Sequence, residues 1–338
     1  MDILFLGTSA GAPTRQRNVT GLAVLAEQGG DWYLVDCGEA TQHQLQRTPL
    51  SVHGLQAIFI THIHGDHCYG LPGLLAGAGM SGRKAPLPII APAGIADWLK
   101  ATQELTELFL PFELEFIAVE SMQDWTDGKL HVQATKLSHR VPSFAYSFTE
   151  AHTESVLDIA KLRAEGIPQG PLWGKLKNGE NVAHEGQTLH SSAYLTYPHA
   201  VRRIVVGGDN DTPALLREVC TTAQVLVHEA TYTTDIAEKV GPRVQHSSAA
   251  DVATFAADID LPNLVLTHFS PRYQFDATQS PSIADIRAEA QAHYHGQLFL
   301  AEDFSRFRLH KNGELSRVEV LWAGCQQVRL ISSFVPTK

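Results

Sequence analysis

The sequence predicts an α/β fold in which two βα halves pack face to face, an αββα sandwich with an inserted flexible arm. Short apolar runs that end on polar residues occur in both halves, as expected for buried strands whose carboxyl ends meet at one sheet edge. Segments of helical length alternate with these runs. The two halves share a weak sequence similarity, which favours two related halves. It is seen in the tripeptides Ile60-Thr61-His62 and Leu266-Thr267-His268.

The composition is that of a globular enzyme. The chain has 338 residues, of which 44% are hydrophobic and 18% are charged. Four scattered cysteines, the lack of a signal-peptide pattern and the lack of a long apolar run predict a cytoplasmic protein with no membrane contact. The net charge of −10 argues against a general nucleic-acid binder. It leaves room for a nuclease, because bound metal ions supply positive charge locally.

The first elements are strands at residues 3–6 and 32–35. Between them, residues 7–11 match the GxSxG pattern of serine hydrolases, with Ser9 at the nucleophile position. That pattern requires a helix to follow, whereas Pro13 and a basic loop come next. We therefore expect a tight turn at Ser9.

A third strand, residues 55–61, is followed directly by a cluster of metal-binding side chains. The cluster consists of His62, His64, Asp66 and His67, with Gly65 as a turn. Imidazoles and carboxylates at this density form a ligand set for Zn²⁺ or a similar ion. The spacing allows His62 and His64 to face one ion and the residues beyond Gly65 to face a second. A solvent-exposed His-rich loop is the alternative.

Further elements follow in alternation. We expect helices at residues 70–80 and 95–108, and strands at residues 87–90, 114–119 and 129–135. In the second half, strands at 204–208, 225–227 and 264–267 end at Asp209, at His228-Glu229 and at His268. His139, Asp209 or His268 alone is more typical of a cap or a buried polar contact than of a metal ligand. Their shared position at strand ends favours a common site.

Two segments differ in character from the rest. Residues 158–190 begin with a short helical pattern at 158–165, and the glycines and prolines of residues 166–179 then predict an irregular segment. Residues 305–338 form a C-terminal extension, in which 318–321 and 328–331 predict an added hairpin. The predicted organisation is thus a hydrolase domain at 1–304, with an insertion at about 158–190, and an extension at 305–338.

Several motifs together carry a family resemblance. The HxHxDH cluster after an apolar strand is the signature of the metallo-β-lactamase superfamily. Residues 5–11, 36–39, 62–67, 137–139, 208–209, 228–231, 266–268 and 301–304 occur in the order found in ribonuclease Z, the family of tRNA 3′-processing endonucleases. The chain resembles that family from residue 1 to about residue 304. One position departs from it, because Asn210 follows Asp209 where the family usually has threonine.

The resemblance implies a site for two divalent ions, Zn²⁺ or Mn²⁺. The residues that it implies as ligands of the first ion are His62, His64 and His139. Those implied for the second ion are Asp66, His67 and His268, and Asp209 would bridge the two ions.

The resemblance also implies roles in catalysis and substrate binding. His246 matches a family position proposed to donate a proton to the leaving 3′-oxygen, Glu229 would orient it, and Asp66 would also orient the attacking water. A helix cap at residues 247–248, with His246 merely adjacent, is the alternative. The candidate RNA contacts are Arg15, Arg17, Asn18, Arg272 and Tyr273 near the metals, and Lys175 and Lys177 in the inserted arm.

The implied function is metal-dependent cleavage of the 3′ trailer from tRNA precursors by metal-activated water, leaving a 3′-hydroxyl. In the family, the arm holds the tRNA elbow and reaches across a homodimer. Two other functions stay open at this point. One is a dinuclear hydrolase of small phosphodiesters or of sulfate or carboxylate esters, and the other is an RNA-binding relative without turnover.

Overall fold

Two mixed β-sheets form the body of the molecule in this computed structural model, which describes residues 1–26, 30–151, 155–197 and 199–319. The first sheet has the strand order β19-β18-β1-β2-β3-β4-β5-β6, and the second has the order β17-β16-β15-β14-β9-β8-β7. The strands of the first sheet are β1 (Asp2–Gly7), β2 (Gly21–Leu25), β3 (Trp32–Cys37), β4 (Leu55–Phe59), β5 (Leu87–Ala91), β6 (Leu114–Ala118), β18 (Arg306–Leu309) and β19 (Leu315–Val318). Those of the second are β7 (Trp125–Thr126), β8 (Leu130–Leu137), β9 (Ser143–Glu150), β14 (Arg203–Val206), β15 (Val225–Glu229), β16 (Asn263–Thr267) and β17 (Gln297–Leu300).

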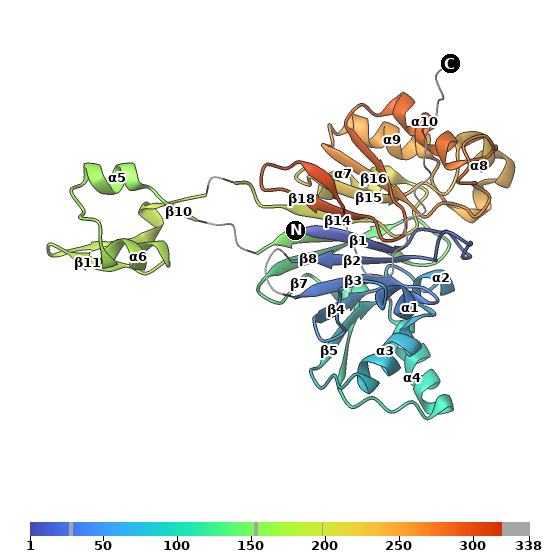
Figure 1. The fold of residues 1–338 in the computed structure, drawn as a ribbon, viewed down its shortest axis with the longest axis horizontal. Helices are drawn as coiled ribbons and strands as arrows, with labels where there is room; N and C mark the ends of the chain where they lie inside the picture. The colour runs from blue at the N-terminus through green and yellow to red at the C-terminus, as the bar shows by residue number, and fades with distance from the viewer. Residues whose placement is uncertain (27–29, 152–154, 198, 320–338) are drawn as a thin grey trace, which may run out of the picture.

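Helices cover the outer face of each sheet, so the predicted αββα sandwich is confirmed (Figure 1). The helices beside the first sheet are α1 (Thr41–Leu45), α2 (Gly65–Cys68), α3 (Leu71–Met80) and α4 (Gly94–Thr106). Those beside the second are α7 (Arg217–Cys220), α8 (Thr234–Val240), α9 (Ala249–Asp258) and α10 (Ile283–His293).

This layering results from the way successive side chains of a buried strand point to opposite faces of the sheet. In β1, Ile3 and Phe5 belong to the core between the sheets, whereas Leu4 and Leu6 belong to the core under the helices. Successive side chains of a strand point to opposite faces, so a strand covered on both sides must be apolar throughout. This is why β1 reads as a continuous apolar run rather than an alternating pattern.

The predicted tight turn after β1 is present. Ser9 is fully buried, and its hydroxyl donates a hydrogen bond to the carbonyl oxygen of Ala12 at 2.6 Å. A nucleophilic serine needs an exposed hydroxyl at the start of a helix. The structure therefore gives Ser9 a structural role.

The inserted arm contains β10 (Val156–Leu157), α5 (Ile159–Ala164), α6 (Pro171–Lys177), β11 (Val182–His184), β12 (Gln187–Leu189) and β13 (Leu195–Thr196). It stands apart from the body (Figure 1) and has its own small core, which includes Leu162, Trp173 and Leu176. The chain leaves and re-enters the body at neighbouring points, because the backbone N–H of Glu150 donates to the carbonyl oxygen of Arg202 at 3.1 Å.

Three expectations about these segments are corrected. Residues 166–179 are not wholly irregular, because α6 begins with Pro171 at its first turn and buries Trp173 and Leu176. The arm is longer than residues 158–190, since its paired strands extend from Val156 to Thr196. The domain boundary at residue 304 is wrong, because β18 pairs with β1 and forms a hairpin with β19 in the main sheet. Of the hairpin expected at 318–331, residues 320–331 lie outside the described residues.

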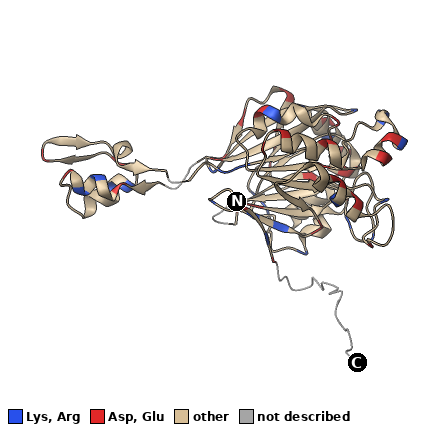
Figure 2. Cartoon of the chain, turned by 90° about the horizontal axis from the view of Figure 1, so that it is seen from above, with Lys and Arg blue, Asp and Glu red and all other residues tan. Residues whose placement is uncertain are grey.

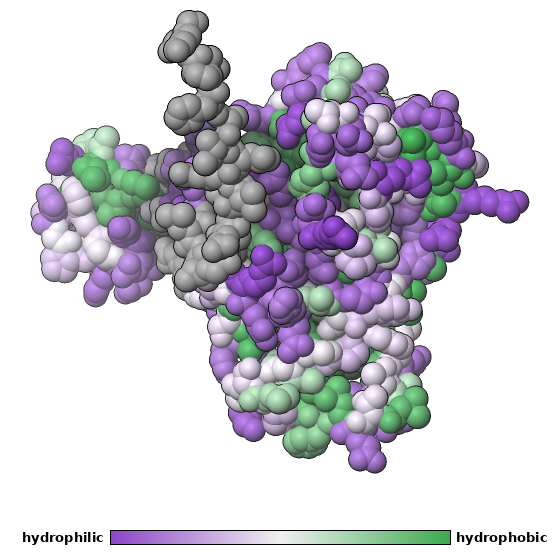
Figure 3. Space-filling model, turned by 45° about the vertical axis from the view of Figure 1, so that its right-hand side comes forward, coloured by the Kyte–Doolittle hydropathy of each residue, from purple (hydrophilic) through white to green (hydrophobic). Residues whose placement is uncertain are grey.

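The face shown in Figure 3 is mainly hydrophilic, with apolar patches at its lower end, on the arm and at the upper right. Exposed apolar side chains gather around the ends of α3 and α4, where Met80, Leu105 and Phe109 are each more than four fifths exposed. No helix among the described residues is both long and apolar enough to cross a membrane.

Candidate metal centre

The predicted ligands come together at the edge of the sandwich where the parallel strands end. His62 follows β4, His139 follows β8, Asp209 follows β14, and His268 follows β16. The turn that carries Asp66 and His67 lies against the end of β3, and a Cβ atom on Gly38 would be only 2.3 Å from the carbonyl oxygen of Asp66. Glycine is therefore required there for the two segments to approach each other.

One group of candidate ligands consists of His62, His64, His139 and Asp209, whose ligand atoms lie within 4.8 Å of one another. The His62 Nε2 atom is 3.1 Å from His64 Nδ1, and His139 Nε2 is 3.2 Å from the same His64 atom. Facing ring nitrogens at these distances are the arrangement expected of imidazoles that share an ion.

A second group consists of Asp66, His67 and His268. The two rings face each other, with 3.3 Å between their Nε2 atoms. Asp209 connects the two groups: its Oδ2 is 3.5 Å from His62 Nε2, and its Oδ1 is 3.4 Å from His67 Nε2 and from His268 Nε2. One carboxylate oxygen thus faces each group, which is the geometry of a bridging ligand.

A layer of hydrogen bonds behind the ligands fixes their rings. Asp36 accepts from His67 Nδ1 at 2.7 Å, the carbonyl of Gln245 accepts from His139 Nδ1 at 2.8 Å, and the Thr231 hydroxyl is 3.0 Å from His268 Nδ1. Such contacts orient ligating imidazoles and select the tautomer that leaves the other nitrogen free for a metal. Sequence reasoning missed Asp36 and Thr231 as site residues. Asp36 could have been found from its place at the end of an apolar run in the sequence. In the structure it adopts a φ of 60°, which is uncommon for a residue other than glycine.

The charges of the site fit divalent cations. Burial, together with neighbouring imidazoles, holds the pKa of His62 well below its usual value, so the ring is neutral, as a metal ligand must be. Burial opposes the ionised form of Asp209, but the surrounding histidines outweigh it, and the pKa of Asp209 lies well below its usual range. Burial also opposes a charge on His67, yet the carboxylates of Asp209, Asp66 and Asp36 raise its pKa to about 10. The buried carboxylates of Asp209 and Asp36 and the partly buried carboxylate of Asp66 therefore favour a nearby cation, which bound metal would supply.

His246 and Glu229 form a hydrogen-bonded pair at the rim of this cluster. The Nδ1 atom of His246 is 3.0 Å from both carboxylate oxygens of Glu229 and 3.8 Å from Asp209 Oδ2. Burial lowers the pKa of His246, but Glu229 more than offsets this and raises it to about 9. The ring is therefore protonated near neutral pH. His246 also forms a third group that could hold a metal ion, together with Asp209 and His268.

The helix cap weighed as an alternative at this position is also present. Ser248 and Asp251 form a capping box at the start of α9. It does not displace His246 from the site, because the cap uses Ser248 while the His246 ring faces Glu229.

A pocket of about 300 Å³ opens onto the cluster. It is lined by Gly11, Glu39, His64, Gly65, Asp66, Tyr69, Arg140, Asp209, His246 and His268. Tyr69 and Arg140 were not predicted from the sequence, because a single exposed tyrosine or arginine does not form a recognisable motif.

Asn210, the departure from the family pattern, is fully buried behind Asp209. Its backbone N–H donates to Glu229 at 2.7 Å, its side-chain oxygen accepts from the backbone of Ser138, and its amide nitrogen lies 3.1 Å from His228 Nε2. Asn210 is not among the residues that line the pocket. It therefore supports the position of Asp209 and Glu229 rather than the choice of substrate.

The candidate RNA contacts fall into two sets. Arg15 is exposed, Asn18 is partly buried, and Arg272 is exposed over the ring of Tyr232, which in turn faces His246. Lys175 and Lys177 are exposed on α6 of the arm. Arg272 is linked to the candidate site through Tyr232 and His246, and Asn18 donates to the carbonyl oxygen of Glu39 at the pocket. The two lysines lie in the arm.

The predictions that Arg17 and Tyr273 contact RNA are wrong, because both side chains are buried. Arg17 is 4% exposed and donates to the Thr8 hydroxyl and to the carbonyl of Ala301, so it anchors the loop from inside. Tyr273 is also 4% exposed, and its hydroxyl accepts from the backbone N–H of Thr233 at 2.6 Å. Neither side chain is open to a phosphate.

Comparison with known proteins places these features in context. Residues 1–150 match the family model described as anti-Pycsar protein Apyc1. Ribonuclease Z of Pseudomonas putida strain W619 is 55% identical over 318 residues, which cover 94% of this chain and 99% of that protein. Ribonuclease Z of Brevibacillus brevis is 40% identical over 293 residues, covering 86% of this chain and 92% of that protein.

Solved structures show the same architecture. Human tRNase Z, short form, superposes with a TM-score of 0.61 at 27% identity, covering 90% of this chain and 98% of that chain. The metallo-β-lactamase fold protein YhfI of Bacillus subtilis has a TM-score of 0.62 with the same coverage, and at 19% identity it shows a shared fold alone.

Proposed function

We propose the function of this chain from its family. The chain belongs to the ribonuclease Z family, because it is 55% and 40% identical to two members of that family over most of its length. It is a metal-dependent endoribonuclease that processes the 3′ end of tRNA. The observation that carries this assignment is the bridging geometry of Asp209 between two ligand groups, with the His246–Glu229 pair at the rim.

The donor set fits two divalent ions, and the nitrogen and oxygen donors suit Zn²⁺, with Mn²⁺ as the alternative. His62, His64 and His139 would hold one ion, Asp66, His67 and His268 the other, and Asp209 both. When bound, the ions would supply the positive charge and the activation of water that phosphodiester hydrolysis needs.

The protein's own groups would perform the proton transfers. His246, protonated near neutral pH, would donate a proton to the leaving 3′-oxygen, and Glu229 would hold the ring in position. Asp66 accepts a hydrogen bond from the backbone N–H of Gly11 at 2.7 Å, and His67 and His268 overcome the effect of burial and lower its pKa. An ionised Asp66 would orient the attacking water through a hydrogen bond.

The protein would contact the RNA substrate in two regions, near the scissile bond and at the arm. Arg15, Asn18 and Arg272 would contact the RNA near the scissile bond, and the arm with Lys175 and Lys177 would grip it at a distance. We further propose a homodimer in which the arm of one subunit serves the other, and a cytoplasmic location alongside its tRNA precursors.

Incubation of the purified protein with a 3′-extended tRNA precursor, with the product ends mapped, tests the function. The expected products are a tRNA ending in a 3′-hydroxyl and a 5′-phosphorylated trailer. Turnover of bis-(p-nitrophenyl) phosphate with no cleavage of the precursor would point instead to a hydrolase of small esters. No turnover of either substrate, with RNA still bound, would identify an RNA-binding relative.

A further inference from the structure

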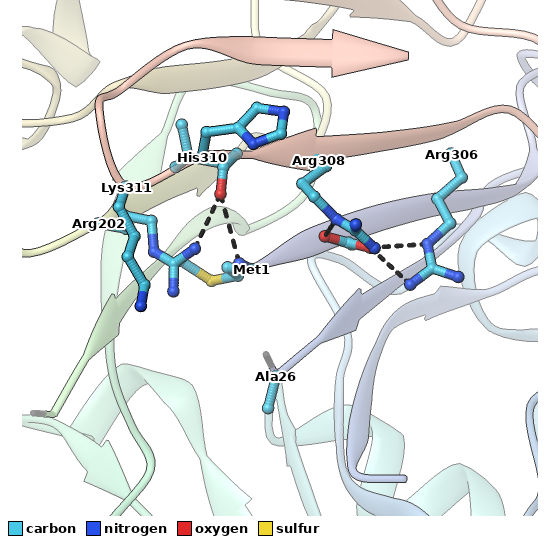
Figure 4. A pocket seen from close by; sticks show the side chains of 9 residues that line it. Met1, Ala26, Arg202, Arg306, Arg308, His310 and Lys311 are labelled. Atoms are coloured by element: carbon cyan, nitrogen blue, oxygen red, sulfur yellow. Dashed lines mark hydrogen bonds and ion pairs between the residues drawn. The ribbon is translucent and has the colours of Figure 1, made fainter. Parts of the chain in front are cut away.

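Another pocket, of about 500 Å³, lies where β1 pairs with β18 (Figure 4). The Asp2 carboxylate accepts hydrogen bonds there from Arg306 Nε at 2.8 Å and from Arg308 Nε at 3.0 Å. These contacts join the two strands, so the charges of this wall belong to the sheet. Charge does not single out one surface elsewhere, since Figure 2 shows cationic and acidic residues spread together over the body and the arm. Contacts other than charge are therefore needed to recognise a particular part of an RNA.

The pocket at the metal cluster offers such a contact in the ring of Tyr69. Among the described residues that line this pocket, Tyr69 has the only aromatic side chain other than histidine. The remaining lining residues are glycines, imidazoles and charged side chains, which suit metal ions and phosphate oxygens. Tyr69 is 59% exposed, and its hydroxyl makes no hydrogen bond with another of the residues that the structure describes. The ring is thus an open apolar surface in a polar pocket.

The turn that carries the candidate ligands fixes the position of the Tyr69 ring. A Cβ atom on Gly65 would be 2.2 Å from Cε2 of the ring and 2.5 Å from each of its neighbours, Cδ2 and Cζ. The two neighbours are hardly farther away than Cε2 itself, so Gly65 lies over the face of the ring rather than at its edge. Only glycine leaves room for this contact. Trp98 of α4 is a second support, with 6.0 Å between the ring centroids and an angle of 35° between the planes.

A ring held in this way is ready to stack on a base. Gly65 covers part of one face of Tyr69, and the exposure of the residue leaves much of the remaining ring surface open. Because the ring is positioned before RNA binds, little conformational entropy is lost when a base stacks on it. Unpaired bases stack on aromatic side chains in proteins that bind single-stranded RNA. The chemistry of Tyr69 therefore suits a nucleobase, beside a cluster that suits a phosphate.

We propose that the Tyr69 ring stacks on the first base of the 3′ trailer. The inference rests on the proposed function, because it takes precursor RNA as the substrate. In that function His246 donates a proton to the leaving 3′-oxygen, which belongs to the last nucleotide of the tRNA. His246 lines the pocket from the second half of the sandwich, whereas Tyr69 lines it from the first half. The base at Tyr69 is therefore that of the nucleotide beyond the cleaved bond.

The stack distinguishes the substrate from the product. Mature tRNA has no trailer base, so it lacks this contact and leaves the pocket more readily than the precursor does. All bases have a flat aromatic face, so stacking on Tyr69 accepts trailers that differ in sequence.

Cleavage of precursors that lack a single base tests the stack. The metal-loaded enzyme receives a 3′-extended tRNA precursor, the same RNA with an abasic first trailer nucleotide, and the same RNA with an abasic last tRNA nucleotide. Mapped product ends define these two positions. Tyr69→Ala should lower kcat/KM for the unmodified precursor roughly 10-fold, as expected when one base stack is lost. It should cause no further loss on the RNA without the first trailer base, because the contact is already absent there.

Two further variants separate the ring from other causes. Tyr69→Phe keeps the aromatic face and should cleave all three RNAs as the unsubstituted enzyme does. Phe109→Ala removes a ring that is 82% exposed beyond the end of α4, and it should change none of the rates. The Tyr69 variants should leave the dependence of binding on salt unchanged, because the ring makes no ionic contact. If Tyr69→Ala holds less metal than the unsubstituted protein, Tyr69→Leu, which still covers Gly65 but has no ring, repeats the test.

Several results would contradict the stack. An undiminished loss by Tyr69→Ala on the RNA without the first trailer base, or no loss on the unmodified precursor, would overturn it. A loss that disappears only on the RNA without the last tRNA base would overturn the assignment to the trailer. An equal loss in Tyr69→Phe would assign the effect to the hydroxyl and overturn stacking. Failure of the unsubstituted enzyme to cleave the precursor, with turnover of bis-(p-nitrophenyl) phosphate, would instead contradict the proposed function.

Discussion

At the scale of single residues, the central feature is that each oxygen of Asp209 faces a different ligand group. We expect elemental analysis to find about two divalent ions per chain. Asp209→Ala should lower occupancy of both positions, whereas His268→Ala should mainly empty one. Asp211→Asn, a neighbouring carboxylate outside every ligand group, is the control and should keep its metal. Full metal content in Asp209→Ala would remove this residue from the bridging position.

His246 allows a test of proton donation. His246→Ala should retain metal and RNA affinity but lose on the order of 10²–10⁴-fold in cleavage rate, as is typical when a general acid is removed. Glu229→Gln should show part of this loss, because the charge that holds the ring protonated is gone. The loss should shrink for a substrate that releases p-nitrophenolate, since that leaving group needs no proton. An equal loss on both substrates would contradict the assignment.

Asp303 gives a prediction for the dependence of stability on pH. Burial raises the pKa of its carboxyl to about 6, although it accepts hydrogen bonds from Thr8, from the backbone of Asn18 and from Gln44. The folded state then binds more protons than the unfolded state between about pH 4 and pH 6, so this group makes stability fall as the pH rises through that window. The size of the effect is on the order of 2 kcal/mol.

Substitution of Asp303 by an uncharged residue should remove that fall. Asp303→Asn keeps one oxygen as an acceptor and offers an amide to the Thr8 hydroxyl, which can turn to accept it. Urea unfolding at several pH values should therefore show a flatter profile from pH 4 to pH 6 than for the unsubstituted protein. A profile with the same slope would mean that other groups cause the pH dependence.

At the scale of elements, the arm is the part whose removal can be tested most directly. Replacement of residues 155–197 by a short glycine-serine link should be tolerated by the body, because Glu150 and Arg202 already meet at the neck. We expect KM for precursor tRNA to rise on the order of 10- to 100-fold and binding to become less sensitive to salt, since phosphate contacts are lost. Hydrolysis of bis-(p-nitrophenyl) phosphate should stay nearly unchanged, because a small substrate never reaches the arm. Unchanged cleavage of tRNA would show that the arm is only a loop.

The arm also marks where element prediction from sequence failed. Glycine and proline at residues 166–179 indicated an irregular segment, yet Pro171 stands in the first turn of α6, where its missing N–H costs nothing. The three-residue spacing of Trp173 and Leu176 fits one face of a helix, a pattern that the prediction did not use. Elsewhere the elements followed from apolar runs, as in β1, where burial on both faces leaves little choice of residue.

At the scale of the whole molecule, the family resemblance implied the residues of the candidate site, and their position at strand ends favoured a common site, because strand ends of parallel sheets share one edge. A sequence pattern does not show how deeply a side chain is buried. Arg17 and Tyr273 have the chemistry of phosphate contacts, but the packing of distant segments buries both. Asp36 was missed as a supporting residue for the same reason, because its contact with His67 depends on the turn that follows β4.

The proposed dimer can be tested by complementation. Light scattering should first show twice the mass of one chain. At precursor concentrations well below the raised KM of the armless enzyme, a subunit without its arm and a subunit carrying Asp209→Ala should each cleave precursor tRNA only weakly alone. If the arm serves the other subunit, mixed dimers regain roughly a quarter of the full activity, because half of the dimers are mixed and each has one working site. No recovery in a mixture that forms mixed dimers would place the arm and the active site in the same subunit.

The pairing of β1 with β18 has a consequence for how the protein is made. The edge of β1 that faces β18 stays open until residues 306–309 have been synthesised, although β1 already ends at residue 7. At about 5–20 residues per second, that interval is roughly 15–60 s on the ribosome. During this time an apolar strand has an unpaired edge, which is a template for wrong partners. The growing polypeptide therefore depends on protection of its first strand until its last described hairpin has been translated.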